Sequence, residues 1–126
     1  MARAVLFVVM ALSSLAGCAT YNVKEGLSGV NAGYTKNQVA PGLFWIFART
    51  AIAPWPSFDG AREIWNTEAA NLCGGRDYKE IPGREYTYEL ATGARPYLVT
   101  AKDGHVLCAT SPLSIVQAEA LIREKK

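Results

Sequence analysis

The stretch Asp59–Gly75, DGAREIWNTEAANLCGG, carries the clearest structural signal in the chain. Asp59 suits a helix N-cap, because its carboxylate can accept hydrogen bonds from the free amides of the first turn. Gly74 and Gly75 end the pattern, since glycine readily adopts the left-handed conformation that closes a helix. Between them one apolar stripe recurs at helical spacing, made of Ala61, Ile64, Trp65, Ala69, Leu72 and Cys73. The stretch therefore predicts an amphipathic helix with Cys73 on its buried side.

The residues after this helix are typical of strands. Tyr86–Leu90 alternates apolar and polar side chains, as a half-buried strand does. Two more apolar runs, Pro96–Ala101 and His105–Ala109, flank Asp103-Gly104. Asp-Gly between apolar runs is a strong signal for a two-residue hairpin turn. We therefore expect three strands here, the last two joined by that turn.

The expected hairpin fixes which side chains share a face. A two-residue turn at Asp103-Gly104 pairs Val99 with Cys108. The more apolar face, which we expect against the helix, then carries Tyr97, Val99, Ala101, Val106 and Cys108. Cys108 is thus expected to point towards Cys73.

Another hairpin is predicted before the helix. Pro41-Gly42 is a turn signal between the runs Tyr34–Val39 and Leu43–Thr50. Leu43–Ala48 is apolar at every position, so this strand is either covered on both faces or leaves an apolar face exposed.

A short helix is expected at the C-terminus, where Ser114 and Gln117 form a capping-box pattern. Residues 34–126 are therefore expected to form a single globular α+β domain. We expect a small antiparallel sheet of about four to five strands with a central helix and a C-terminal helix, in the order β-β-α-β-β-β-α.

Length and charge exclude several classes of protein. The chain has 126 residues, with 13 Lys and Arg against 11 Asp and Glu. That length suits one domain and argues against a multidomain enzyme. The near balance of charge lacks the basic stripe of a nucleic-acid binder, so no nucleic-acid partner is expected.

The N-terminus has the order of a secretory signal. Met1-Ala2-Arg3 is basic, Ala4–Leu12 is uncharged and apolar, and small residues follow up to Gly17. The apolar run is too short for a membrane span, which needs about 20 residues.

Leu15-Ala16-Gly17-Cys18 resembles the lipobox of bacterial lipoproteins. The resemblance implies cleavage between Gly17 and Cys18, with lipid on the Cys18 thiol and on the new amino terminus. Residues 1–17 are then a removed signal peptide, and residues 18–33 are a lipidated, flexible tether. Ala19, rather than Asp, favours the outer membrane, with the domain facing the periplasm. The acyl chains make the membrane the first expected partner.

Cys73 and Cys108 remain as an even pair in an oxidising compartment, so the simplest expectation is one disulfide. The alternatives are free thiols or half of a metal site. The two cysteines form neither a CxxC pair nor a Cys/His cluster, so no metal site and no cofactor are expected.

Catalytic motifs are missing from the sequence. His105 is the only histidine, and no G-x-S-x-G, H-E-x-x-H or P-loop pattern occurs. We therefore do not expect an enzyme. Aromatic side chains gather in the N-terminal half, where Trp45, Phe47 and Trp55 are candidate anchors for a protein partner. The alternative is that these rings pack the core and the sheet.

The whole chain resembles small proteobacterial envelope lipoproteins of unknown function. Beyond the lipobox, the matching features are Gly33-Tyr34-Thr35, Pro41-Gly42-Leu43-Phe44, the Ala61-x-x-x-Trp65-x-x-x-Ala69-x-x-Leu72-Cys73 pattern and Gly104-His105-Val106-Leu107-Cys108. The resemblance implies a lipid-anchored envelope protein with a non-catalytic structural or protein-binding role. A periplasmic module for a small ligand or a glycan is the alternative, and an envelope hydrolase is the third hypothesis.

Overall fold

The computed structural model describes residues 25–27, 32–50, 58–75, 77–92 and 95–125. Its elements, in chain order, are β1 (Gly33–Ala40), β2 (Leu43–Thr50), α1 (Phe58–Cys73), β3 (Tyr78–Thr92), β4 (Arg95–Cys108) and α2 (Ile115–Glu124). The fold is α+β, as expected. Among the described residues, no helix is long and apolar enough to cross a membrane.

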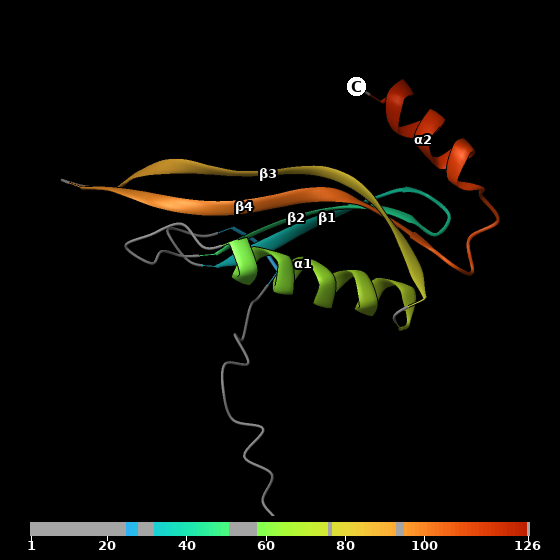
Figure 1. Ribbon diagram of the computed structural model, residues 1–126, viewed down its shortest axis with the longest axis horizontal. Coiled ribbons are helices and arrows are strands. Elements are labelled where there is room, and N and C mark those ends of the chain that lie inside the picture. Colours follow the sequence, from blue (N-terminus) through green and yellow to red (C-terminus); the bar gives the residue numbers. More distant parts are fainter. Residues whose placement is uncertain (1–24, 28–31, 51–57, 76, 93–94, 126) are drawn as a thin grey trace, which may run out of the picture.

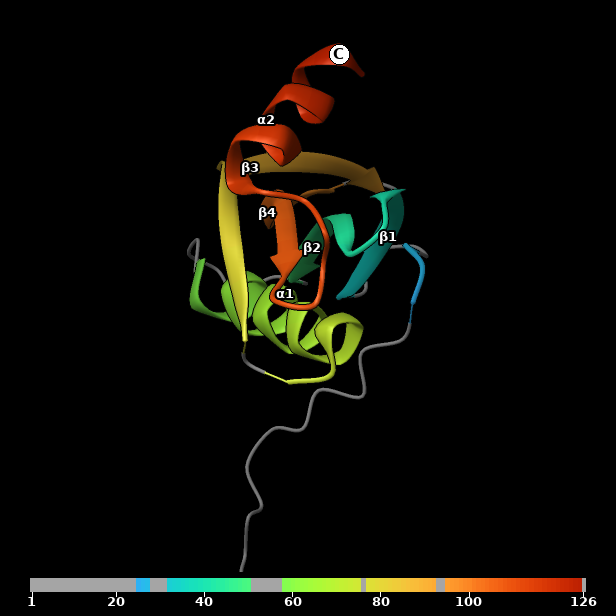
Figure 2. The ribbon, with the colours of Figure 1, turned by 90° about the vertical axis from the view of Figure 1, so that its right-hand side faces the viewer.

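The four strands form one antiparallel sheet with the order β1-β2-β4-β3. Helix α1 lies against one face of this sheet, and α2 lies on the other side, beyond one end of the strands (Figures 1 and 2). The expected central helix is therefore a helix on one face. The described residues after α1 form two strands and not three, so the predicted strand order is wrong at that point.

The error lies at Asp103-Gly104, which is not a turn. Both residues lie inside β4, which pairs with β3 from Arg95 to Cys108. The hairpin connection lies instead between Thr92 and Arg95, which are register partners. The predicted pairing of Val99 with Cys108 is therefore wrong. Val99 is the register partner of Tyr88, and Cys108 is the register partner of Tyr78.

Asp103 and Gly104 have structural roles within the strand. The Asp103 carboxylate accepts a hydrogen bond of 3.0 Å from the backbone amide of Arg84, inside an irregularity of β3 between Pro82 and Glu85. At Gly104, a Cβ atom would lie 3.5 Å from the ring of Trp65 and 3.2 Å from the amide nitrogen of Gly83. Glycine is therefore used here because α1 and β3 approach the strand closely.

A continuous strand also changes which side chains share a face. Successive strand residues point to opposite faces of the sheet. Because β4 contains no turn, this alternation continues without interruption from Arg95 to Cys108. Val106 packs against α1, as expected, and Lys102 lies on the same side, with its Nζ 4.5 Å from the centre of the Trp65 ring. Val99 and Ala101, which were expected there, lie on the opposite face.

The first hairpin is confirmed. Gly42 has a φ of 71°, a left-handed conformation that glycine adopts readily, and β1 pairs with β2 from Gly33 to Ala40. The apolar strand β2 is covered by α1 on one face and by α2 at one end of the other face. Ile46 and Ala48 pack under α1, whereas Leu43 packs with α2.

Trp65 is the centre of the core beneath α1. It is fully buried, and its Nε1 donates a hydrogen bond of 3.1 Å to the carbonyl oxygen of Ile46. On the same helix, Glu68 has a side chain that is only 6% exposed and forms an ion pair of 3.1 Å with Lys36 of β1. This hydrogen bond raises the pKa of Lys36, because it stabilises the charged ammonium.

A second ion pair joins α1 to β3, where Arg62 donates two hydrogen bonds of 2.7 Å to Glu85. These bonds lower the pKa of Glu85 below its ordinary value of 4.5. A carboxylate with a lowered pKa stabilises the folded state above that ordinary value, and the stabilisation disappears as the pH falls through the lowered pKa. Glu85→Gln is therefore expected to flatten the acid-side loss of stability. Urea unfolding of both proteins at neutral and acidic pH measures this effect, with Glu89→Gln as the control. An unchanged pH slope would contradict the prediction.

Helix α2 begins with the capping box that the sequence predicts. The Ser114 hydroxyl accepts a hydrogen bond from the Gln117 amide, and the Gln117 side chain accepts one from the Ser114 amide. Ala118 is fully buried over Leu43 and Leu107 at one end of the sheet. The helix therefore covers only this end of the face opposite α1.

Candidate functional site

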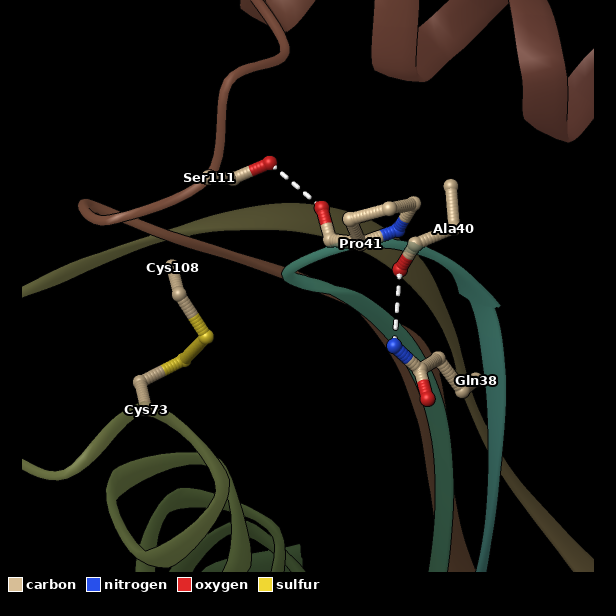
Figure 3. Close-up of a disulfide and its surroundings, with 6 residues drawn as sticks. All are labelled: Gln38, Ala40, Pro41, Cys73, Cys108 and Ser111. Atoms are coloured by element: carbon tan, nitrogen blue, oxygen red, sulfur yellow. Dashed lines mark hydrogen bonds between the residues drawn. A yellow bond between two sulfur atoms is a disulfide. The ribbon is translucent and has the colours of Figure 1, made fainter.

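The two cysteines of the folded domain lie at bonding distance. Cys73 ends α1 and Cys108 ends β4, and they form a disulfide with a Cα–Cα distance of 5.1 Å across a sequence separation of 35 (Figure 3). Beside them the Ser111 hydroxyl donates a hydrogen bond of 2.6 Å to the carbonyl oxygen of Pro41. The end of α1, the end of β4 and the β1–β2 turn are thus linked in one place.

The other predicted site residues divide into two groups. Cys18, the cleavage position at Gly17 and the aromatic Trp55 lie outside the described residues, as does the whole segment 1–17. The segment 18–33 is described only in part, and its Glu25 and Gly26 form isolated bridges with Tyr34. Trp45 and Phe47 are described, and their rings stack with centroids 6.3 Å apart. Trp45 and Phe47 are therefore the predicted aromatic anchors whose surroundings the structure describes.

Both rings belong to the face of the sheet opposite α1. The register places Ile81 of β3, His105 of β4 and Trp45 of β2 in one row across this face. The neighbouring row, with Leu43 and Leu107, is covered by α2. The Ile81–His105–Trp45 row is therefore the first one beyond the edge of the helix.

This row forms the floor of a pocket of about 530 Å³. Ile122 of α2 lines one side. Pro82, Gly83 and Arg84 of β3, with Asp103 of β4, complete the lining. The volume lies within the usual range of small-ligand pockets, roughly 300–1,000 Å³. We call this hollow the Trp45 pocket.

The irregularity in β3 supplies the polar side of the Trp45 pocket. Between the register pairs Pro82–Gly104 and Glu85–Lys102, β3 has one residue more than β4. The extra residue shifts the alternation of the β3 side chains by one position. As a result Ile81, Tyr86 and Tyr88 all lie on the face opposite α1. Asp103 accepts from the amide of Arg84 at 3.0 Å and forms an ion pair of 3.5 Å with its guanidinium.

Beyond the Trp45 pocket the sheet face is closed by its own side chains. Arg49 donates a hydrogen bond of 3.2 Å to the hydroxyl of Tyr88, and this bond passes over β4 where Val99 and Ala101 are fully buried. Burial raises the pKa of the neighbouring Tyr86, and the charge of Asp103 adds to that rise. In the part of the chain that the structure describes, the Arg49–Tyr88 hydrogen bond thus covers Val99 and Ala101.

The face under α1 is instead rich in ion pairs. Glu68, Glu80 and Glu85 each pair with a cation, respectively Lys36, Lys102 and Arg62. In the described part of the chain, no group of three or more His, Cys, Asp or Glu residues could hold a metal ion. The carboxylates of this face thus act in packing.

Several site residues were missed from the sequence. Arg84 and Asp103 were not expected near Trp45, because Asp103 was placed in a turn. The local signal of the β3 irregularity that unites them is Pro82-Gly83, because proline and glycine inside a strand often mark a bulge. Glu68 could have been found, since its spacing from Ile64 and Trp65 places it on the apolar stripe of the helix.

Comparison of the chain with family models, curated proteins and solved structures gives no match. The function is therefore inferred from the sequence and the geometry of this chain alone.

Proposed function

We propose that this protein is a lipid-anchored lipoprotein of the bacterial cell envelope, with a non-catalytic structural or protein-binding role. The observation that carries the proposal is the Leu15–Cys18 lipobox behind a basic and then apolar leader. Acylation at Cys18 would hold the domain at a membrane, and the alanine at position 19 favours the outer membrane.

The cysteine inventory supports this proposal. The chain has three cysteines, and two of them, Cys73 and Cys108, are bonded to each other. Cys18 is the remaining thiol, at the position where the lipobox requires one. A disulfide also agrees with a compartment outside the reducing cytosol.

A protein-binding role is supported by the half-buried Trp45 ring, because tryptophan is enriched among interface anchors; the Phe47 ring stacked beside it is buried in the core. No part of this role calls for a cofactor. The partner we expect is another envelope protein.

Metabolic labelling with alkyne-tagged palmitate tests the lipid anchor. Bacteria expressing the whole chain are expected to incorporate label into the wild-type protein, with the signal peptide removed. Cys18→Ser is expected to abolish the label and to leave Met1 in place, because the acylated thiol is absent. Cys73→Ser is the matched control and should still be labelled. An unlabelled wild-type protein, or a labelled Cys18→Ser variant, would refute the anchor.

A second candidate function is a periplasmic module that binds a small ligand or a glycan. The specific observation in its favour is the Trp45 pocket, which combines an aromatic ring with convergent polar groups.

A further inference from the structure

We propose that the Trp45 pocket binds an uncharged sugar, with the ring of Trp45 stacked against the sugar and with Arg84 and Asp103 as its hydrogen-bonding groups. The proposal rests on the second candidate function and names its ligand class. It is independent of the lipid anchor, so each proposal can fail alone.

The floor of the pocket suits a flat ligand with an apolar face. Trp45 is half-buried and lies in register with His105, which in turn lies in register with Ile81. Phe47 stacks beside Trp45 at an interplanar angle of 21°. The face of an indole carries negative potential and attracts the C–H groups of a saturated ring. A pyranose presents such C–H groups on its faces and hydroxyl groups on its rim.

The polar groups of the pocket can bind those hydroxyls both as hydrogen-bond donors and as acceptors. The Arg84 guanidinium donates hydrogen bonds, and the carboxylate oxygens of Asp103 accept them. The side chain of Arg84 is 77% exposed and that of Asp103 is 13% exposed, so the guanidinium is at the rim and the carboxylate is inside. Sugar hydroxyls, which also donate and accept, match this set.

The charge of the pocket favours a neutral ligand. Arg84 and Asp103 form an ion pair of 3.5 Å, so the one cation and the one carboxylate that line the pocket offset each other. Because the two groups neutralise each other, the pair gives neither an acidic nor a cationic ligand a net attraction. A ligand with hydroxyls and no charge can bind both groups by hydrogen bonds alone.

Titration followed by nuclear magnetic resonance tests the proposal. The whole chain is labelled with ¹⁵N and kept in a detergent that lacks a sugar headgroup, so that the detergent does not compete. The neutral probe is the β-1,4-linked disaccharide of N-acetylglucosamine, and the acidic probe is glucuronate. We expect the disaccharide to shift the Trp45 indole signal saturably, with little response to glucuronate. Trp45→Phe identifies that indole signal.

Two variants and one control make the test specific. Trp45→Leu removes the stacking ring, and Arg84→Gln removes an exposed donor with little expected effect on folding. Each is expected to weaken disaccharide binding about tenfold or more. Arg62→Gln makes the same change under α1 and should bind normally. If Trp45→Leu does not fold, Arg84→Gln against Arg62→Gln still decides the matter.

Three results would overturn the proposal. The first is no shift of the Trp45 indole with the disaccharide at tens of millimolar. The second is equal binding by wild type and Arg84→Gln. The third is a response to glucuronate alone, which would identify an anion site. Palmitate labelling is unaffected by any of these results.

Discussion

Replacing Trp65 by alanine is expected to lower the free energy of unfolding by roughly 3–5 kcal/mol, the range measured for large aromatic residues in cores. Trp65 is fully buried between α1 and the sheet. Its loss leaves a cavity beneath Gly104 and removes the donor to the Ile46 carbonyl oxygen. Lys102 would also lose the ring over which its ammonium lies. Urea unfolding followed by far-ultraviolet circular dichroism measures the change.

Two comparisons separate the contributions at this position. Trp65→Phe keeps most of the buried ring and loses the hydrogen bond, so a loss of about 1–2 kcal/mol is expected. Trp45→Ala, on the opposite face and half-buried, is expected to have a smaller effect than Trp65→Ala. A loss of stability for Trp65→Ala that is no larger than that for Trp45→Ala would show that the core is not centred under α1.

Removing the Cys73–Cys108 bond is expected to have an effect of similar size. For a sequence separation of 35, the entropy of the unfolded chain predicts a loss of roughly 4 kcal/mol. The double variant Cys73→Ser/Cys108→Ser should therefore unfold at a much lower urea concentration than the wild type. Both serine variants keep Cys18, so the lipid anchor is not disturbed.

Reduction supplies the matched control for this prediction. Dithiothreitol should destabilise the wild type to the level of the double variant, and it should leave the double variant unchanged. The prediction is refuted if non-reduced protein contains two alkylatable thiols at Cys73 and Cys108, or if reduction leaves the unfolding curve in place.

Local sequence patterns predicted the elements that depend on nearby residues. The α1 helix, the turn at Gly42 and the capping box at Ser114 were predicted correctly, because each depends on contacts within a few residues. The predicted N-cap of α1 was wrong, since the helix begins at Phe58 and Asp59 lies in its first turn. Asp103-Gly104 was predicted wrongly by the same kind of reasoning. A turn signal there was overridden by pairing with β3 and by the close approach of Trp65.

The candidate site was predicted in part. Trp45 and Phe47 were chosen as aromatic anchors; their rings stack on the face opposite α1, where Trp45 lines the pocket and Phe47 is buried in the core. Their polar neighbours Arg84 and Asp103 could not be predicted, because they meet through an irregularity in strand pairing. The alternation of side chains along β3 shifts at that point. Pro82-Gly83 marks a possible bulge, but only the register with β4 shows which side chains the bulge brings together.

The sequence by itself determined the helices, the first hairpin, the lipobox prediction and the pairing of the two domain cysteines. These features follow from short-range spacing and from the inventory of residue types. Only the tertiary structure decided that β4 is one continuous strand, that α1 and α2 lie on opposite sides of the sheet, and that the Trp45 pocket exists. Those features depend on register and packing between segments distant in the chain, where the gain from burying Trp65 and satisfying the Arg84 amide outweighs a local preference for a turn.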